Sequence, residues 1–159
     1  MLELPQGQDD VPVSACITCM GLGKPRHTFW MTRKVNSQNG GGHNGGAAMH
    51  AYRRERDAWI RDLYFMVKSG GVTEADGRRV VRITRDFAGR CRKMDYGNLV
   101  GGLKPVVDAM QREIGGKSRP IKGAGIIIDD SPDHFIGIYE QRRGDIDGVT
   151  FEVWDLPDK

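Results

Sequence analysis

The pattern of apolar and polar positions predicts five strands and two helices. Five segments have patterns typical of strands: residues 11–20, 78–88, 126–130, 136–139 and 149–154. Apolar residues at helical spacing predict one helix over residues 47–68 and a second that begins near Asn98 and ends before Gly115. The order of these elements is β-α-β-α-β-β-β. It predicts an α+β fold with a mixed β-sheet and two main helices.

The two expected helices carry different local signals. In the first, one apolar stripe contains Tyr52, Trp59, Leu63 and Met66, while most of the arginines lie off it. Two glycines follow this helix, as is common at a helix C-terminus. Pro105 lies inside the second helix, where it removes a backbone hydrogen bond, so we expect a kink there.

Length and composition favour a single domain over residues 1–159. A chain of 159 residues with 38% hydrophobic residues can bury one modest core. Residues 36–46 are rich in glycine and hold nothing to pack, so we expect a flexible loop. No apolar run is long enough to cross a membrane, no signal-peptide pattern opens the chain, and three cysteines do not suggest a disulfide framework. We therefore expect a cytoplasmic protein with no membrane partner.

Positive charge is concentrated in one part of the chain. The formal net charge is only +3, from 24 basic and 21 acidic residues. Between residues 78 and 93, however, seven Lys and Arg residues accompany a single acid, Asp86. Such a segment suits a groove that follows a phosphate backbone. The alternative is a strand face that the arginines keep solvated.

Four aspartates lie where predicted elements begin or end, or on a predicted helix. Asp95 precedes the second helix, Asp108 lies on it, and Asp129 and Asp130 end the apolar segment 126–130. Carboxylates gathered from separate segments are the ligands that Mg²⁺ prefers, and Mg²⁺ can activate water for phosphodiester hydrolysis. A helix cap at Asp95 and a turn at Asp129 and Asp130 are the competing interpretations.

Two smaller motifs add candidate chemistry. Lys104 and Asp108 are four residues apart and share a helix face, so the lysine could stabilise charge on a phosphate or simply form a surface ion pair. Cys16 and Cys19 have the spacing of half a zinc knuckle, but a second close pair is absent. A small zinc-dependent regulator is therefore a separate hypothesis for this chain.

The order of these motifs resembles the RusA family of Holliday junction resolvases. The resemblance rests on residues 90–99, on Lys104 and Asp108, and on the segment 127–130 that ends in two aspartates. It covers about a quarter of the chain closely. It implies a small homodimeric endonuclease that depends on Mg²⁺, with Mn²⁺ as a substitute, and that resolves four-way junctions or other branched DNA in recombination and repair. Members are common in bacteriophages and prophages, which would place the protein in the host cytoplasm.

The resemblance also implies roles for individual residues. The catalytic residues would be Asp95, Lys104 and Asp130, and the metal ligands Asp95, Asp108, Asp129 and Asp130. Asn98 matches the asparagine of the family motif. The DNA-binding residues would be Arg82, Arg85, Arg90, Arg92 and Lys93.

The chain departs from the family pattern at two places. The motif Asp-x-Asp-Asn has lost its second acid, because position 97 is glycine. Three additional residues also separate Asn98 from Lys104. A site with one carboxylate fewer holds Mg²⁺ less tightly. The alternative function is therefore a protein of the same fold that binds junction DNA without cutting it.

Overall fold

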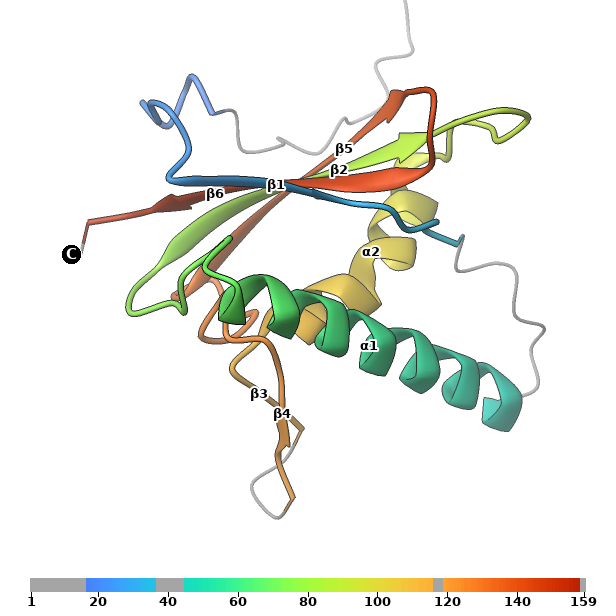
Figure 1. Ribbon diagram of the computed structural model, residues 1–159, viewed down its shortest axis with the longest axis horizontal. Helices are drawn as coiled ribbons and strands as arrows, with labels where there is room; N and C mark the ends of the chain where they lie inside the picture. The colour runs from blue at the N-terminus through green and yellow to red at the C-terminus, as the bar shows by residue number, and fades with distance from the viewer. Residues whose placement is uncertain (1–16, 37–44, 116–118, 158–159) are drawn as a thin grey trace, which may run out of the picture.

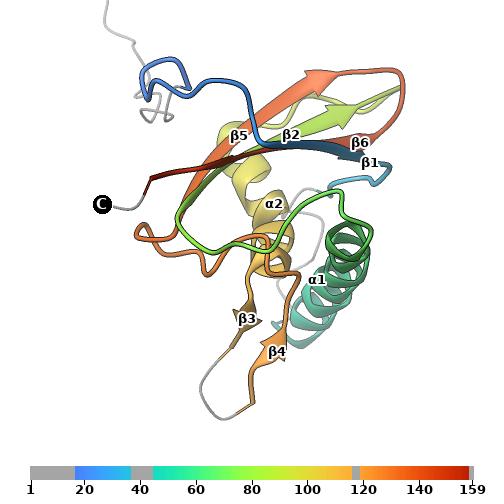
Figure 2. The same ribbon diagram turned by 60° about the vertical axis from the view of Figure 1, so that its left-hand side comes forward.

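The computed structural model describes residues 17–36, 45–115 and 119–157. Four strands form one sheet in the order β1-β6-β2-β5, from β1 (His27–Met31), β2 (Arg79–Phe87), β5 (Phe135–Arg143) and β6 (Gly148–Asp155). The helices are α1 (Gly45–Lys68) and α2 (Tyr96–Met110). Both lie on the same side of the sheet (Figures 1 and 2). The expected α+β fold with a mixed sheet and two helices is confirmed.

The sheet is mixed because β2 and β5, which are joined by a connection that contains α2, run parallel to each other. β6 pairs antiparallel with both β1 and β2, while β2 and β5 pair in parallel. Parallel neighbours need a long crossover connection, and the segment with α2 supplies it. β2 is therefore a central strand, and its residues are almost all buried.

The main core fills the space between the sheet and the two helices. Trp59 and Leu63 of α1 and Leu103 of α2 are fully buried against Ile83 and Phe151 of the sheet. A second, smaller cluster covers the opposite face of the sheet, where residues 17–22 pack on strands β2, β5 and β6. The apolar stripe of α1 thus has the role that its spacing predicts.

α2 passes through Pro105 without interruption. Pro105 is buried on the side that packs into the core, and the helix continues from Tyr96 to Met110. Its end comes earlier than the glycines at 115 and 116 suggested. The reason is a two-stranded hairpin that begins just after the helix and that the sequence did not predict, formed by β3 (Glu113–Ile114) and β4 (Ile121–Lys122).

One predicted strand, residues 126–130, is wrong, and another, residues 11–20, lies mostly outside the described residues. Of residues 11–20, only 17–20 are described, and they form a turn, while the first strand within the described residues is β1. Residues 126–130 do not form a strand. Ile126 and Ile127 are fully buried, as an apolar run suggests, but among the described residues the only strand-type pairing of this segment is one bridge from Ile127 to Gln111. These two isoleucines are buried because they pack into the main core next to the end of α2, and not because they belong to the four-stranded sheet.

Two other expectations concern the glycine-rich loop and helices that could cross a membrane. Of the glycine-rich loop 36–46, residues 37–44 lie outside the described residues, and α1 already begins at Gly45. In the described part of the chain, no helix has the length and apolar character needed to cross a membrane.

Candidate active site

Lys104 lies between two carboxylates that come from different parts of the chain. Its Nζ donates a hydrogen bond to Asp108 Oδ1 at 2.7 Å and lies 3.5 Å from Asp130 Oδ2. Asp108 is on the last turn of α2, whereas Asp130 follows the buried segment at Ile127. The structure thus brings together three of the residues that the family resemblance implicates.

Tyr52 joins this cluster from α1. Its hydroxyl donates to Asp108 Oδ2, and Gln111 Nε2 lies 3.4 Å from Asp108 Oδ1. Burial raises the pKa of Tyr52, and the hydrogen bond to Asp108 raises it further, so the phenol stays protonated and donates. The sequence placed Tyr52 only on an apolar stripe. Nothing in the sequence indicated that its hydroxyl would contact a residue of α2.

The charges of the cluster keep Lys104 protonated. Burial by itself lowers the pKa of Lys104, but the hydrogen bond to Asp108 and the negative charges of Asp108 and Asp130 outweigh it and raise the pKa. Asp108 already accepts from three side chains, while the side chain of Asp130 is 46% exposed. Asp130 is therefore the more accessible carboxylate of the two.

Tyr139 of β5 lies close enough to Asp130 for the charge of that carboxylate to affect its pKa. Burial raises the pKa of Tyr139 to about 12, with smaller contributions from Tyr96 and the negative charge of Asp130. Tyr96 is the first residue of α2. Tyr139 is thus within electrostatic range both of Asp130 and of the N-terminal end of α2.

Asp95 caps the N-terminus of α2. Its Oδ1 accepts the backbone N–H of Asn98 at 2.9 Å, and its Oδ2 accepts from the Asn98 side chain. These two hydrogen bonds, the backbone one first, lower the pKa of Asp95. Asp108 comes thirteen positions after Asp95, a rise of about 20 Å along a helix axis. These two predicted ligands are therefore at opposite ends of α2 and cannot hold one ion together.

Asp129 has the turn role that the sequence analysis named as the alternative. Its Oδ1 accepts the backbone N–H of Ser131 at 2.9 Å, and its Oδ2 lies 3.0 Å from His134 Nδ1. The Ser131 hydroxyl contributes most to lowering the pKa of Asp129, followed by the Ser131 backbone N–H and by His134. The carboxylate of Asp129 is thus largely occupied by donors of its own turn.

Position 97 has room for a side chain next to Asp95. A Cβ atom at Gly97 would lie 3.5 Å from Asp95 Oδ1, an ordinary van der Waals distance, and would meet nothing closer. The backbone of Gly97 does not have a positive φ. The local geometry would therefore accept an aspartate at position 97, as the family motif has it.

Several arginines of the basic segment stabilise the fold. Arg79 is fully buried and donates to Asp155 at 2.7 Å and to the carbonyl of Ile126 at 2.8 Å. Arg82 makes a two-point contact with Glu152, at 2.5 and 2.7 Å. Alternation along a strand could not reveal these pairings, because the partners come from distant segments.

Arg85 does not lie on the surface that we expected for DNA. Its exposure is 3%, and its Nη1 donates to Gln141 Oε1 at 3.2 Å and to the carbonyl of Arg92 at 3.3 Å. A guanidinium held in this way is not available to a phosphate. Arg85 instead holds the segment that leads from β2 to α2.

The remaining predicted DNA-binding residues are exposed. Arg90, Arg92 and Lys93 all lie on this connecting segment, directly before Asp95. Within the described residues no carboxylate forms an ion pair with any of the three. Their charges are therefore free to meet an anionic partner beside the N-terminus of α2.

The carboxylates fit a divalent cation only in part. Among the described residues, no three His, Cys, Asp or Glu side chains form a group that could hold a metal ion. Asp95 and Asp130 are the exposed members of the predicted ligand set, and their oxygens are of the type that Mg²⁺ prefers. Of the cysteines considered for zinc, Cys16 lies outside the described residues and Cys19 is exposed.

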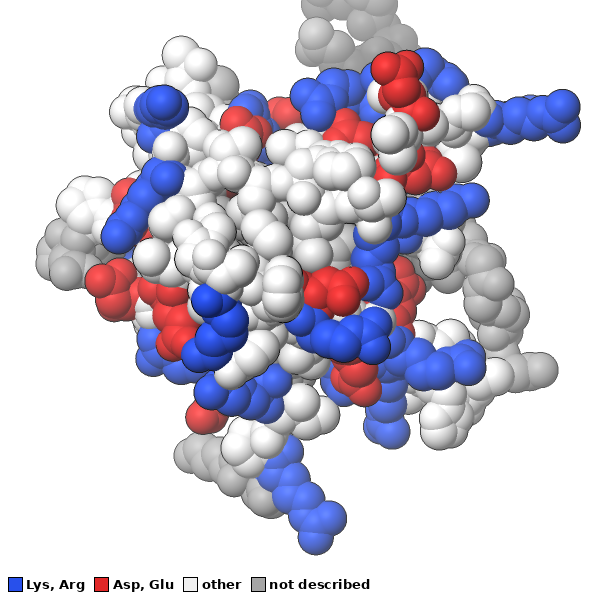
Figure 3. Space-filling model, in the orientation of Figure 1, with Lys and Arg blue, Asp and Glu red and all other residues white. Residues whose placement is uncertain are grey.

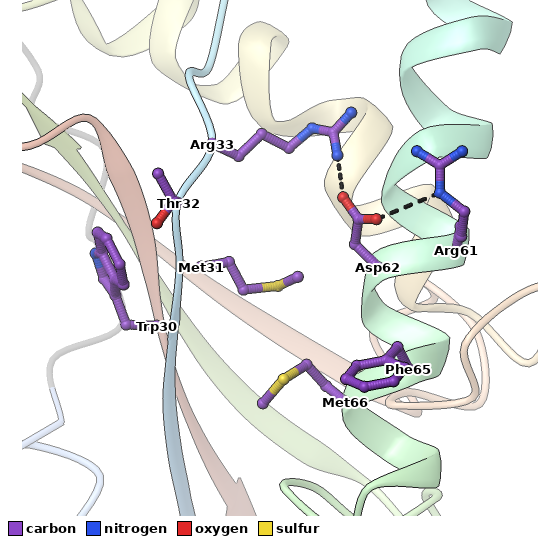
Figure 4. A pocket seen from close by; sticks show the side chains of 8 residues that line it. All are labelled: Trp30, Met31, Thr32, Arg33, Arg61, Asp62, Phe65 and Met66. Carbon is purple, nitrogen blue, oxygen red and sulfur yellow. Dashed lines mark hydrogen bonds and ion pairs between the residues drawn. The ribbon is translucent and has the colours of Figure 1, made fainter.

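A groove that the sequence analysis missed lies apart from this cluster, between β1 and α1. Its volume is about 460 Å³. Figure 4 shows Met31 of β1 and Met66 of α1 extending toward each other across it, with the pair Arg33 and Asp62 at one end. Its other lining residues are Trp30, Thr32, Arg61 and Phe65. None of its residues belongs to the Lys104 cluster.

Comparisons with protein-family models, with curated proteins and with solved structures found no match to this chain. The fold class therefore comes from the structure itself. The function rests on the residues described above and on the motif resemblance.

Proposed function

We propose that this chain is an endonuclease of the RusA type that cuts four-way junctions or other branched DNA by phosphodiester hydrolysis. The observation that carries the proposal is the position of Lys104 between the carboxylates of Asp108 and Asp130. A protonated lysine next to an accessible carboxylate is an arrangement suited to a phosphate that gains negative charge during reaction. The exposed cations of residues 90–93 lie on the chain just before Asp95.

In this proposal the exposed carboxylate of Asp130 would hold Mg²⁺ beside Lys104, whereas Asp95, at the other end of α2, could hold only a separate ion. When bound, the ion supplies an activated water and positive charge beside the scissile phosphate, and Mn²⁺ can take its place. Asp108, whose side chain is 15% exposed, and Asp129, whose two oxygens contact Ser131 and His134, are less available to an ion than Asp130. The ligand set is thus smaller than the family resemblance implies.

Lys104 stabilises the negative charge that develops on the phosphate. Its ammonium is held in place by Asp108, and Asp108 is in turn held by the hydroxyl of Tyr52. We therefore assign Asp108 and Tyr52 as positioning residues. Because the pKa of Lys104 is raised, the lysine is fully protonated at neutral pH.

Arg90, Arg92 and Lys93 contact the DNA backbone in this proposal. They are exposed and have no acidic partner within the described residues. Such cations provide sequence-independent affinity for DNA, which falls as the salt concentration rises. A homodimer would present two such surfaces and match the twofold symmetry of a four-way junction.

A second candidate function is junction binding without cutting. Gly97 favours it, because this position lacks the carboxylate that the motif would provide. It predicts salt-sensitive binding of junction DNA and no product at any concentration of Mg²⁺ or Mn²⁺.

The test is cleavage of a labelled synthetic four-way junction with Mg²⁺ or Mn²⁺, by the unmodified chain and by Asp130→Asn. Asp133→Asn is the matched control, because Asp133 is an exposed acid three residues away that forms no ion pair within the described residues. We expect paired symmetric nicks from the unmodified chain and from the control, and none from Asp130→Asn, which should still bind. Cutting by Asp130→Asn would show that the site is assigned wrongly. Binding without nicks by all three proteins would favour the second candidate function.

A further inference from the structure

The β3–β4 hairpin extends away from the body of the molecule. Its two strands pair antiparallel, with Glu113 opposite Lys122 and Ile114 opposite Ile121. Figures 1 and 2 both show it leaving the end of α2 on the side away from the sheet. The groove and the four-stranded sheet do not involve it, and of its strand residues Ile114 alone is buried. The groove and the four-stranded sheet therefore do not account for the projecting position of the hairpin.

The base of the hairpin is bonded firmly to α2. The backbone N–H of Ala124 donates to the carbonyl of Ala109 in α2 at 2.9 Å, and that of Gly123 donates to the carbonyl of Arg112, just after the helix, at 3.1 Å. A Cβ atom at Gly123 would lie only 2.0 Å from the carbonyl oxygen of Gln111. This close approach requires glycine, and it fixes the direction of the hairpin relative to the helix.

The hairpin is inserted between two residues of the candidate active site. The chain leaves α2 after Met110, two residues beyond Asp108, and returns through the buried Ile127 to Asp130. The backbone N–H of Ile127 donates to the carbonyl of Met110 at 3.0 Å, so the outgoing and returning segments meet there. A molecule held by the hairpin is thereby placed at a set position relative to Lys104.

The hairpin and the neighbouring end of α1 carry cations without acidic partners. Lys122 and Lys68 lie 5.9 and 5.1 Å from the ring of Tyr64, and Arg119 is exposed. In the described part of the chain, none of these three cations forms an ion pair. Figure 3 shows Lys and Arg side chains gathered at this lower end of the molecule. Glu113 is the only acid among the described hairpin residues.

We infer that this hairpin and the end of α1 hold a duplex arm of the DNA substrate, an inference that rests on DNA being the partner under the proposed function. Unpaired cations on a projecting element complement the phosphates of a duplex, and a two-stranded ribbon has the dimensions of a DNA groove. The exposed Ile121 adds apolar contact at the same place. The arm would then lie on the side of Lys104 opposite to the cations of residues 90–93.

The experiment measures how DNA affinity depends on salt for Arg119→Ala/Lys122→Ala. A matched control, Lys24→Ala/Lys34→Ala, removes the same charge from exposed lysines in the segments before and after β1, and Figure 1 shows β1 in the sheet, away from the hairpin. The probes are a four-way junction, a linear duplex and a single strand of the same length. Each lost duplex phosphate contact lowers the slope of log affinity against log salt by about 0.9. We expect a decrease of about 1.8 for junction and duplex with the hairpin variant, and no comparable decrease with the control.

Three results would overturn the inference: an unchanged slope, an equal decrease in the control, or a decrease confined to the single strand. Cleavage of the junction, measured on the same proteins, separates this inference from the proposed function. If the unmodified chain binds but never cuts, the proposed cleavage fails while the slopes still decide the role of the hairpin. If it binds none of the three DNA probes, both proposals are wrong. Unchanged thermal unfolding of both double variants confirms that the loss is one of contact.

Discussion

The glycine at the base of the β3–β4 hairpin gives a quantitative test of how the hairpin is attached. In Gly123→Ala, the new methyl group would lie 2.0 Å from the carbonyl oxygen of Gln111 and 3.1 Å from that of Ala109. Both atoms belong to backbone, so neither can rotate away as a flexible side chain would. The returning segment must therefore move away from the end of α2 by more than about 1 Å to restore ordinary contact distances.

The size of the effect follows from the hydrogen bonds that this movement breaks. The N–H groups of residues 123, 124 and 125 donate to the carbonyls of Arg112, Ala109 and Gln111, at or just after the end of α2, at 3.1, 2.9 and 3.1 Å. Each such bond contributes about 1 kcal/mol net to stability. We therefore expect Gly123→Ala to lower the free energy of unfolding by about 3 kcal/mol. For a chain of this length that corresponds to a decrease of about 6–12 °C in Tm.

The assay is urea and thermal unfolding of the variant beside a second glycine substitution. Gly46→Ala is the control, because a Cβ atom at Gly46 in the first turn of α1 meets nothing within 4 Å. Alanine is favoured over glycine in a helix, so this variant should be unchanged or more stable by up to about 1 kcal/mol. A loss below about 1 kcal/mol in Gly123→Ala would refute the reasoning, since it would mean that the close approach is not needed.

Three further predictions concern the candidate site. Gly97→Asp places a carboxylate beside Asp95, so calorimetric titration should show Mg²⁺ binding at the N-terminus of α2 that is tighter than in the unmodified chain, and equal affinity would show that Asp95 is no ligand there. Asp108→Asn removes the ion pair that raises the pKa of Lys104, so urea unfolding should show the variant less stable by about 0.5 kcal/mol at pH 8. This stabilisation is complete below the ordinary lysine pKa near 10.4 and is lost as the pH rises through the raised folded-state pKa, so the difference between the two proteins should shrink over that range. Arg85→Met should lower stability by about 2 kcal/mol through its lost buried hydrogen bonds, whereas Arg90→Ala should not, and equal unfolding midpoints for the two would show that Arg85 has no structural role.

The sequence by itself determined the elements whose signal is local. The apolar stripe of α1 predicts residues 47–68, and the helix occupies Gly45–Lys68. Alternation over residues 78–88 predicts a strand, and β2 occupies Arg79–Phe87. The cap at Asp95 and the turn at Asp129 were likewise readable as alternatives, because a capping or turn residue bonds to backbone only two or three positions away.

Only the tertiary structure decided which of these residues act together. The apolar run at 126–130 indicates burial correctly, but burial does not specify a strand partner, and Ile127 instead packs beneath α2. Arg85 and Arg90 are indistinguishable as residues of a basic segment, yet the first is buried and the second is exposed. The meeting of Lys104 with Asp130 depends on segments far apart in the chain. Such contacts are decided by packing across the whole core, and local periodicity carries no information about it.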